Sequence, residues 1–62
     1  MEYEYRIQEW EMWLEVTSDN KPCKEEIIKD AKIKGFELNN LDMWFDNMQG
    51  FWRFRADLVN CS

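Results

Sequence analysis

The sequence predicts an α+β domain in which one helix packs on one face of a three-stranded antiparallel sheet. Three observations lead to this prediction: apolar and polar residues alternate over residues 2–16, a helix with signals at both ends follows Pro22, and two alternating segments flank a turn at residues 47–50. The element order is therefore β-α-β-β. A chain of 62 residues forms one domain, so residues 1–62 are a single small unit.

The predicted N-terminal strand changes its phase near residue 8. Tyr3, Tyr5 and Ile7 share one side of an extended chain, whereas a second apolar set shares a side from residue 10 onwards. This second set is Trp10, Met12, Leu14 and Val16. A β-bulge at Gln8–Glu9 would return both sets to one face. In a straight strand, the first set would instead face away from the domain's own core and need a second surface. Gln-Glu is poor turn chemistry, so a tight hairpin is not expected here.

Residues 23–35 carry the signals of one helix. Pro22 ends a polar loop, Cys23 stands at the N-cap, and Gly35 supplies the left-handed residue after the last turn. The thiol of Cys23 is a weaker acceptor than a serine hydroxyl, so this cap is a poor one. The stripe expected to face the sheet is Ile27, Ile28 and Ala31.

Residues 41–58 predict a β-hairpin around the turn Asn47–Gly50. Asn at the first corner and Gly at the fourth suit a type I turn followed by a left-handed glycine. Asp46 then lies opposite Phe51, and the pairing continues to Leu41 opposite Ala56. One face collects Leu41, Met43, Phe45, Trp52, Phe54, Ala56 and Leu58, and the other collects Asp42, Trp44, Asp46, Phe51, Arg53 and Arg55.

A helix is the rival interpretation of the first half of this hairpin. The spacing of Leu41, Trp44, Phe45 and Met48 also fits one helical face. Such a helix would leave the alternation of residues 52–58 without a partner strand, so the hairpin is preferred.

The last strand is expected at the centre of the sheet because its inward positions are apolar. The N-terminal strand lies antiparallel to it, which gives the spatial order 1-3-2, and the helix covers the apolar face. The predicted core is Trp10, Met12, Leu14, Val16, Ile27, Ile28, Ala31, Met43, Phe45, Trp52, Phe54 and Leu58.

The sheet face without a helix is the expected binding surface, because aromatic residues and arginine dominate binding hot spots. A second candidate surface is the first apolar set of the N-terminal strand, Tyr3, Tyr5 and Ile7, which would be uncovered if the strand were straight. Together, the side chains expected to bind a partner are Tyr3, Tyr5, Ile7, Trp13, Trp44, Phe51, Arg53 and Arg55.

The composition indicates more apolar surface than so small a domain can hide. Hydrophobic residues make up 45% of the chain and include four Trp, four Phe, two Tyr and four Met. A domain of this size buries only about 60% of the surface that its unfolded chain exposes. The surplus predicts a homodimer or another bound protein.

The charge is acidic and unevenly distributed. The net charge is -5, and residues 1–16 hold five Glu against Arg6 alone, or -4. One interpretation is solubility. The sharper hypothesis is that the acidic N-terminal segment binds a basic partner, in the manner of a nucleic-acid mimic.

No motif for catalysis, metal binding or a cofactor is recognisable. The chain has no His, and it shows no phosphate loop, nucleophile elbow or metal-ligand spacing, so neither an enzyme nor a metal or cofactor is expected. Cys23 and Cys61 lack CxxC spacing and are predicted to be free thiols of a cytoplasmic protein. Neither a signal peptide nor a membrane span is expected.

The expected function is that of a non-catalytic protein–protein interaction module, which works as a homodimer or docks on another protein. In size and acidity the chain resembles small phage-encoded inhibitors of host enzymes, a resemblance of type that covers no specific motif. The alternative is single-stranded nucleic-acid binding, in which bases stack on Trp44 and Phe51 beside Arg53 and Arg55. The net charge of -5 argues against this alternative.

Overall fold

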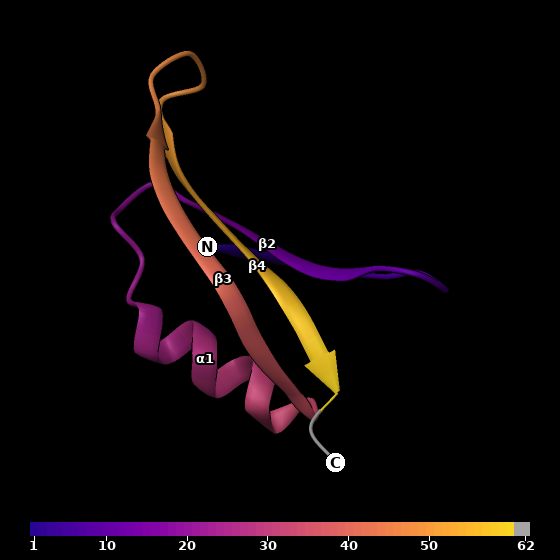
Figure 1. Cartoon of the computed structure of the whole chain (residues 1–62). Helices are drawn as coiled ribbons and strands as arrows, with labels where there is room; N and C mark the ends of the chain where they lie inside the picture. Colours follow the sequence, from indigo (N-terminus) through magenta and orange to yellow (C-terminus); the bar gives the residue numbers. More distant parts are fainter. Residues whose placement is uncertain (61–62) are drawn as a thin grey trace.

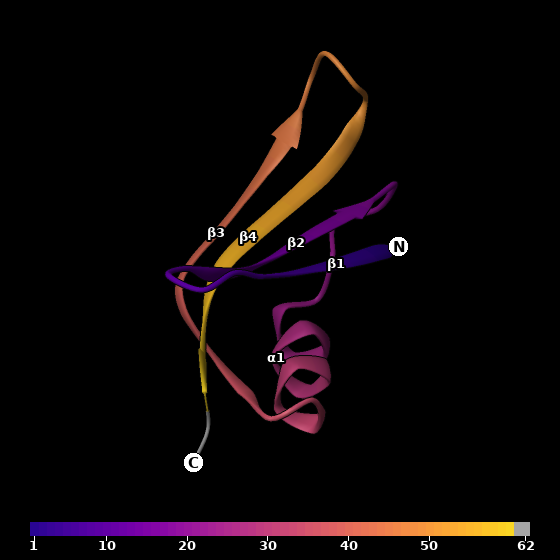
Figure 2. The ribbon, with the colours of Figure 1, turned by 90° about the vertical axis from the view of Figure 1, so that its right-hand side faces the viewer.

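The computed structural model describes residues 1–60 and shows a four-stranded antiparallel sheet with one helix packed against it (Figure 1). The strands are β1 (Glu2–Ile7), β2 (Met12–Ser18), β3 (Phe36–Asp46) and β4 (Phe51–Asn60), and the helix is α1 (Lys24–Ile33). Their order in the sheet is β1-β2-β4-β3. Figure 2 shows that α1 lies to one side of the sheet only.

The prediction of three strands was wrong at the N-terminus, where the chain forms a hairpin of two strands. The backbone amide of Gln8 donates to the carbonyl oxygen of Glu11 at 2.9 Å, and β1 folds back on β2 so that Tyr5 pairs with Leu14. None of residues 8–11 has a positive φ, so this turn needs neither Gly nor Asn. The phase change at residue 8 is therefore the turn itself, and neither a bulge nor a straight strand.

The predicted order of the other strands is confirmed. β4 lies between β2 and β3, as the order 1-3-2 required, and β1 is added at the outer edge of β2. The element order is thus β-β-α-β-β.

The C-terminal hairpin is confirmed in its register near the turn. Asp46 pairs with Phe51, and the pairing runs without interruption to Asp42 opposite Arg55. Gly50 has a φ of 79° and donates its amide to the carbonyl oxygen of Asp46 at 2.7 Å. The rival helix is wrong, since β3 covers all of residues 36–46.

A β-bulge explains why β3 is longer than the sequence predicted. The register shifts between Asn39 and Asp42, and Asn40 has a φ of 53°. The predicted pair between Leu41 and Ala56 therefore does not form. The extra residue reverses the phase of the strand, so that Leu38 faces Leu58 on the helix side instead of pointing away from it.

The helix begins and ends where the sequence indicated. Cys23 is the N-cap and makes no side-chain capping bond, and Gly35, with a φ of 89°, donates its amide to the carbonyl oxygen of Lys32 at 3.0 Å. Ile27 and Ala31 are buried, but Ile28 is exposed, contrary to prediction. The thiol of Cys23 is free and exposed, and Cys61 lies outside the described residues. No helix within residues 1–60 is long and apolar enough to cross a membrane.

The core lies between α1 and the sheet. Its buried residues are Leu14, Val16, Ile27, Ala31, Phe54, Ala56 and Leu58. Tyr3, Tyr5, Met12, Phe36, Leu38 and Met43 pack against this cluster. Three of the predicted core residues are exposed instead: Trp10 is 86% exposed in the β1–β2 turn, Phe45 is 42% exposed, and Ile28 on α1 is 41% exposed. Phe45 packs edge-on against half-buried Trp52 at the end of the β3–β4 hairpin, which extends beyond the helix (Figure 1).

Candidate functional site: the open face of the sheet

One side of the sheet carries no helix, and alternate residues of its strands point outward there. We define the open face as the part of this side formed by β1, β2, the residues of β3 after the bulge and residues 51–57 of β4. Directly paired residues share a face, so the registers assign its members. Its charged and aromatic side chains are Glu2, Glu4, Arg6, Trp13, Glu15, Asp42, Trp44, Asp46, Phe51, Arg53, Arg55 and Asp57.

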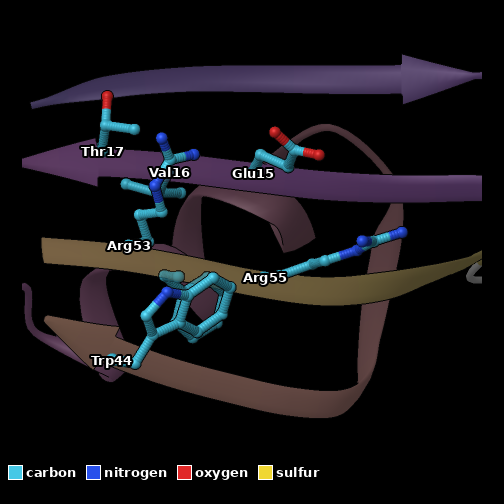
Figure 3. A pocket seen from close by; sticks show the side chains of 7 residues that line it. Glu15, Val16, Thr17, Trp44, Arg53 and Arg55 are labelled. Carbon is cyan, nitrogen blue, oxygen red and sulfur yellow. The ribbon is translucent and has the colours of Figure 1, made fainter. Parts of the chain in front are cut away.

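Trp44 lies on the edge strand β3 and points onto the open face. Its indole extends over β4 with Arg53 on one side and Arg55 on the other (Figure 3). A hollow of about 140 Å³ adjoins it, and Glu15, Val16, Thr17, Trp44, Arg53, Phe54 and Arg55 line this hollow. Trp44 is 40% exposed, so an indole that could pack against a partner is accessible here.

The two central arginines are held in different ways. The Arg53 Nε donates to Asp46 Oδ2 at 2.8 Å, and its guanidinium lies 5.0 Å from the ring centroid of Phe51. The Arg55 guanidinium lies 5.5 Å from the ring of Trp13 and forms no ion pair within residues 1–60. Arg55 can therefore direct its hydrogen-bond donors at another molecule.

Acidic side chains surround this centre. The indole Nε1 of Trp13 donates to Glu15 Oε1 at 3.0 Å, and Arg6 pairs with Glu4 at 2.7 Å. At the β3 edge of the sheet, the side-chain amide of Asn40 donates a hydrogen bond to the carboxylate of Asp57 at 2.8 Å. The open face therefore combines an aromatic and arginine centre with an acidic rim.

Asp46 is the most constrained carboxylate of the open face. Its oxygen atoms accept from the backbone amides of Gln49 and Met48 and from Arg53. The Gln49 amide first, and then Arg53, hold the pKa of Asp46 below its ordinary value.

Five of the predicted binding residues come together on this face, namely Trp13, Trp44, Phe51, Arg53 and Arg55. The other three do not. Tyr3 and Tyr5 lie on the helix side because β1 folds back on β2, and Ile7, next to the turn, is 60% exposed on that same side.

The side chain of Tyr5 makes its contacts with other residues of the same chain. Its hydroxyl donates to the carboxylate of Asp30, its ring stacks on Phe36 at 6.3 Å, and Lys34 lies 5.0 Å from the ring centroid. Burial, followed by the hydrogen bond to Asp30, raises the pKa of Tyr5, and the same hydrogen bond lowers the pKa of Asp30. Burial also raises the pKa of Tyr3. These two tyrosines join β1 to the helix layer.

Sequence reasoning missed the acidic members that β1 adds to the open face. Glu2 and Glu4 pair with Thr17 and Glu15 and so point to the open side. Their alternation with Tyr3 and Tyr5 is visible in the sequence, but the side to which they point depends on the turn at residues 8–11.

Within residues 1–60 no group of three or more His, Cys, Asp or Glu is arranged to hold a metal ion. Comparisons with protein-family models, with curated proteins and with solved structures found no match to the chain.

Proposed function

We propose that the protein is a non-catalytic protein–protein interaction module that binds its partner through the open face. The observation that carries this proposal is the uncovered sheet surface on which Trp13, Trp44 and Phe51 lie beside Arg53 and Arg55. Trp and Arg are enriched at the centres of protein interfaces, where they supply most of the binding free energy. The acidic rim matches the polar periphery of such interfaces.

The geometry favours binding at a low entropic cost. Arg53 is already fixed by Asp46 and Phe51, and Arg55 already lies against Trp13. Side chains that are ordered before association lose less conformational freedom when a partner binds. The sheet therefore presents an organised surface instead of a flexible one.

Site-specific crosslinking tests this proposal. A photoreactive phenylalanine analogue replaces Trp44 on the open face, or exposed Lys29 on α1 as the control, in cells that contain the natural partners. We expect one protein to crosslink at position 44 and not at position 29. The captured protein must then bind the purified domain directly.

Affinity measurements with the purified pair complete the test. Trp44→Ala should cost about 2 kcal/mol of binding, or roughly thirtyfold in Kd, and Lys29→Ala should have no effect. Equal crosslinking at both positions, or a Trp44→Ala variant that binds as tightly as the parent, would contradict the proposal.

We further propose that the module is a small acidic inhibitor of another protein. It rests on the size of the chain and its net charge of -5. If the crosslinked partner is an enzyme, stoichiometric addition of the domain should abolish its activity and the Trp44→Ala variant should not. A partner that stays fully active in the complex would contradict inhibition.

The homodimer stays a prediction, and exposed apolar side chains on the helix side favour it. Leu41 and Phe45 are exposed on β3, and Met48 is exposed in the turn between β3 and β4. Light scattering of the purified protein should give twice the 7.7 kDa of one chain. A monomer mass at concentrations of about 100 μM would exclude a stable dimer.

Single-stranded nucleic-acid binding is the second candidate. The exposure of Trp44 beside Arg55, which has no ion pair within residues 1–60, is the observation that favours it. A labelled oligonucleotide should then show salt-sensitive binding by fluorescence polarisation. Absence of binding at low salt would end this candidate.

A further inference from the structure

We infer, on the basis of the proposed function, that the protein segment recognised by the open face carries Lys or Arg side chains. The open face holds six carboxylates against three arginines, a net charge of -3. The six are Glu2, Glu4, Glu15, Asp42, Asp46 and Asp57. Charge complementarity across an interface selects partners and speeds association, so the face selects for a basic partner.

The acidic excess is greatest over β1 and β2. Glu2, Glu4 and Glu15 line one hollow of about 490 Å³, together with Tyr3, Thr17 and Arg53. Within residues 1–60 only Glu4 of these three carboxylates forms an ion pair, which it makes with Arg6. The carboxylate of Glu2, and the Oε2 atom of Glu15, whose Oε1 accepts from Trp13, can therefore accept hydrogen bonds from a partner's ammonium or guanidinium group.

The exposed indole of Trp44 favours the same class of partner. A cation over the face of a Trp ring is attracted by the ring quadrupole. The ring of Trp13 is already occupied by Arg55, whereas no cation of residues 1–60 lies over Trp44. Trp44 is thus accessible to a guanidinium or a lysine side chain from outside.

Charge disfavours the other occupants of this face. A second copy that docked face to face would bring two surfaces of net charge -3 together. The phosphates of a nucleic acid would be repelled in the same way. A homodimer that uses the helix side would leave the open face available for the basic segment.

Peptide titrations followed by NMR test the inference with defined probes. The probes are three extended peptides of ten residues in which Tyr alternates with Arg, with Gln or with Glu. We expect the Tyr/Arg peptide to shift backbone amides of β1, β2 and β4 on the protein, with a Kd at least tenfold lower than that of the Tyr/Gln peptide. The Tyr/Glu peptide should bind most weakly, and salt should weaken the Tyr/Arg complex.

A matched pair of triple variants assigns the effect to the open face. Glu2→Gln/Glu4→Gln/Glu15→Gln should raise the Kd for the Tyr/Arg peptide at least tenfold. Glu9→Gln/Glu25→Gln/Glu26→Gln removes the same charge away from the open face and should change the Kd less than twofold. Circular dichroism establishes that both variants are folded.

The outcomes separate this inference from the proposed function. Binding of the Tyr/Gln peptide as tightly as the Tyr/Arg peptide would overturn the preference for a basic segment and leave the docking function standing. Equal effects of the two triple variants, or no binding of any peptide, would also overturn the inference. The proposed function fails on its own test, when crosslinking at position 44 captures no specific protein.

Discussion

Asp46 is the side chain that connects the turn, the strand and the open face. Its Oδ1 accepts from the amides of Met48 and Gln49 at 3.0 Å each, and its Oδ2 accepts from Arg53 at 2.8 Å. One carboxylate therefore stabilises the two middle residues of the turn and orients Arg53 on the open face.

Removal of this charge should weaken the dependence of stability on pH. The pKa of Asp46 is lower in the folded state than in the unfolded state, where it is about 4. Its stabilisation is therefore present above about pH 4 and is lost as the pH falls through the lower, folded pKa. Asp46→Asn should lower the free energy of unfolding at pH 7. It should also reduce the amount of stability that is lost when the pH is lowered.

Urea unfolding at a series of pH values between 2 and 7 measures this effect. Asp42→Asn is the control, because within residues 1–60 Asp42 makes no hydrogen bond or ion pair with a side chain or turn amide. If both variants keep the acid dependence of the parent, the role of Asp46 is not the one that the geometry indicates.

At the scale of the elements, the β3–β4 turn depends on one glycine. Gly50 has a φ of 79°, and an added Cβ would meet no atom within 4 Å. Gly50→Ala should therefore cost about 1 kcal/mol through the backbone conformation and not through a clash. Gly50→Asn should cost less, because Asn tolerates left-handed geometry. Equal losses for the two variants in thermal melts would contradict this reasoning.

The contact between β1 and α1 depends on the Tyr5 hydroxyl. Because it donates to Asp30, which also pairs with Lys34 at 2.9 Å, Tyr5→Phe should lower the stability by about 1 kcal/mol. Burial and the Asp30 hydrogen bond raise the pKa of Tyr5 in the folded state. The contribution of the Tyr5 hydroxyl to the free energy of unfolding is therefore complete below about pH 10, and it is lost as the pH rises through the folded pKa.

Denaturant unfolding at pH 7 and pH 11 checks both statements. Tyr3→Phe is the matched control, since the Tyr3 hydroxyl makes no hydrogen bond within residues 1–60. A control variant that loses as much stability as Tyr5→Phe would show that ring burial, and not the hydrogen bond, joins β1 to the helix.

At the scale of the whole molecule, Phe54 supports the fold. It lies on the central strand β4, opposite Met43 on one side and Val16 on the other, and is almost completely buried. Phe54→Ala should cost about 3–5 kcal/mol, which is comparable with the total stability of so small a domain. We expect this variant to be unfolded by circular dichroism at 25 °C.

Replacement of Trp52 should cost less stability than replacement of Phe54, although the sequence predicts both residues in the core. It is half-buried at the end of the hairpin, where it contacts Phe45 and Lys21. Trp52→Ala should therefore retain a cooperative melt at a reduced temperature. A Phe54→Ala variant that melts near the parent temperature, or a Trp52→Ala variant that does not fold, would reverse this ranking.

The candidate site was predictable where its residues are close in sequence. The turn at Asn47–Gly50 and the alternation on both sides of it place Trp44, Phe51, Arg53 and Arg55 on one face, and the structure has them there. Both signals are local, so they need no knowledge of the other strands. The extension of β3 was not predictable in this way, because the bulge at Asn40 reverses the alternation that identifies a strand.

The sequence by itself determined the helix ends, the β3–β4 register between the turn and the bulge, and the aromatic and arginine residues that the hairpin brings to the open face. These features depend on turn and cap residues and on side-chain alternation, which act over a few positions. Only the tertiary structure decided that residues 1–18 form two strands, because no Gly or Asn indicates the turn at residues 8–11. That hairpin puts Tyr5 on Asp30 and brings Glu2 and Glu4 to the open face, since pairing with β2 determines which side of β1 is buried.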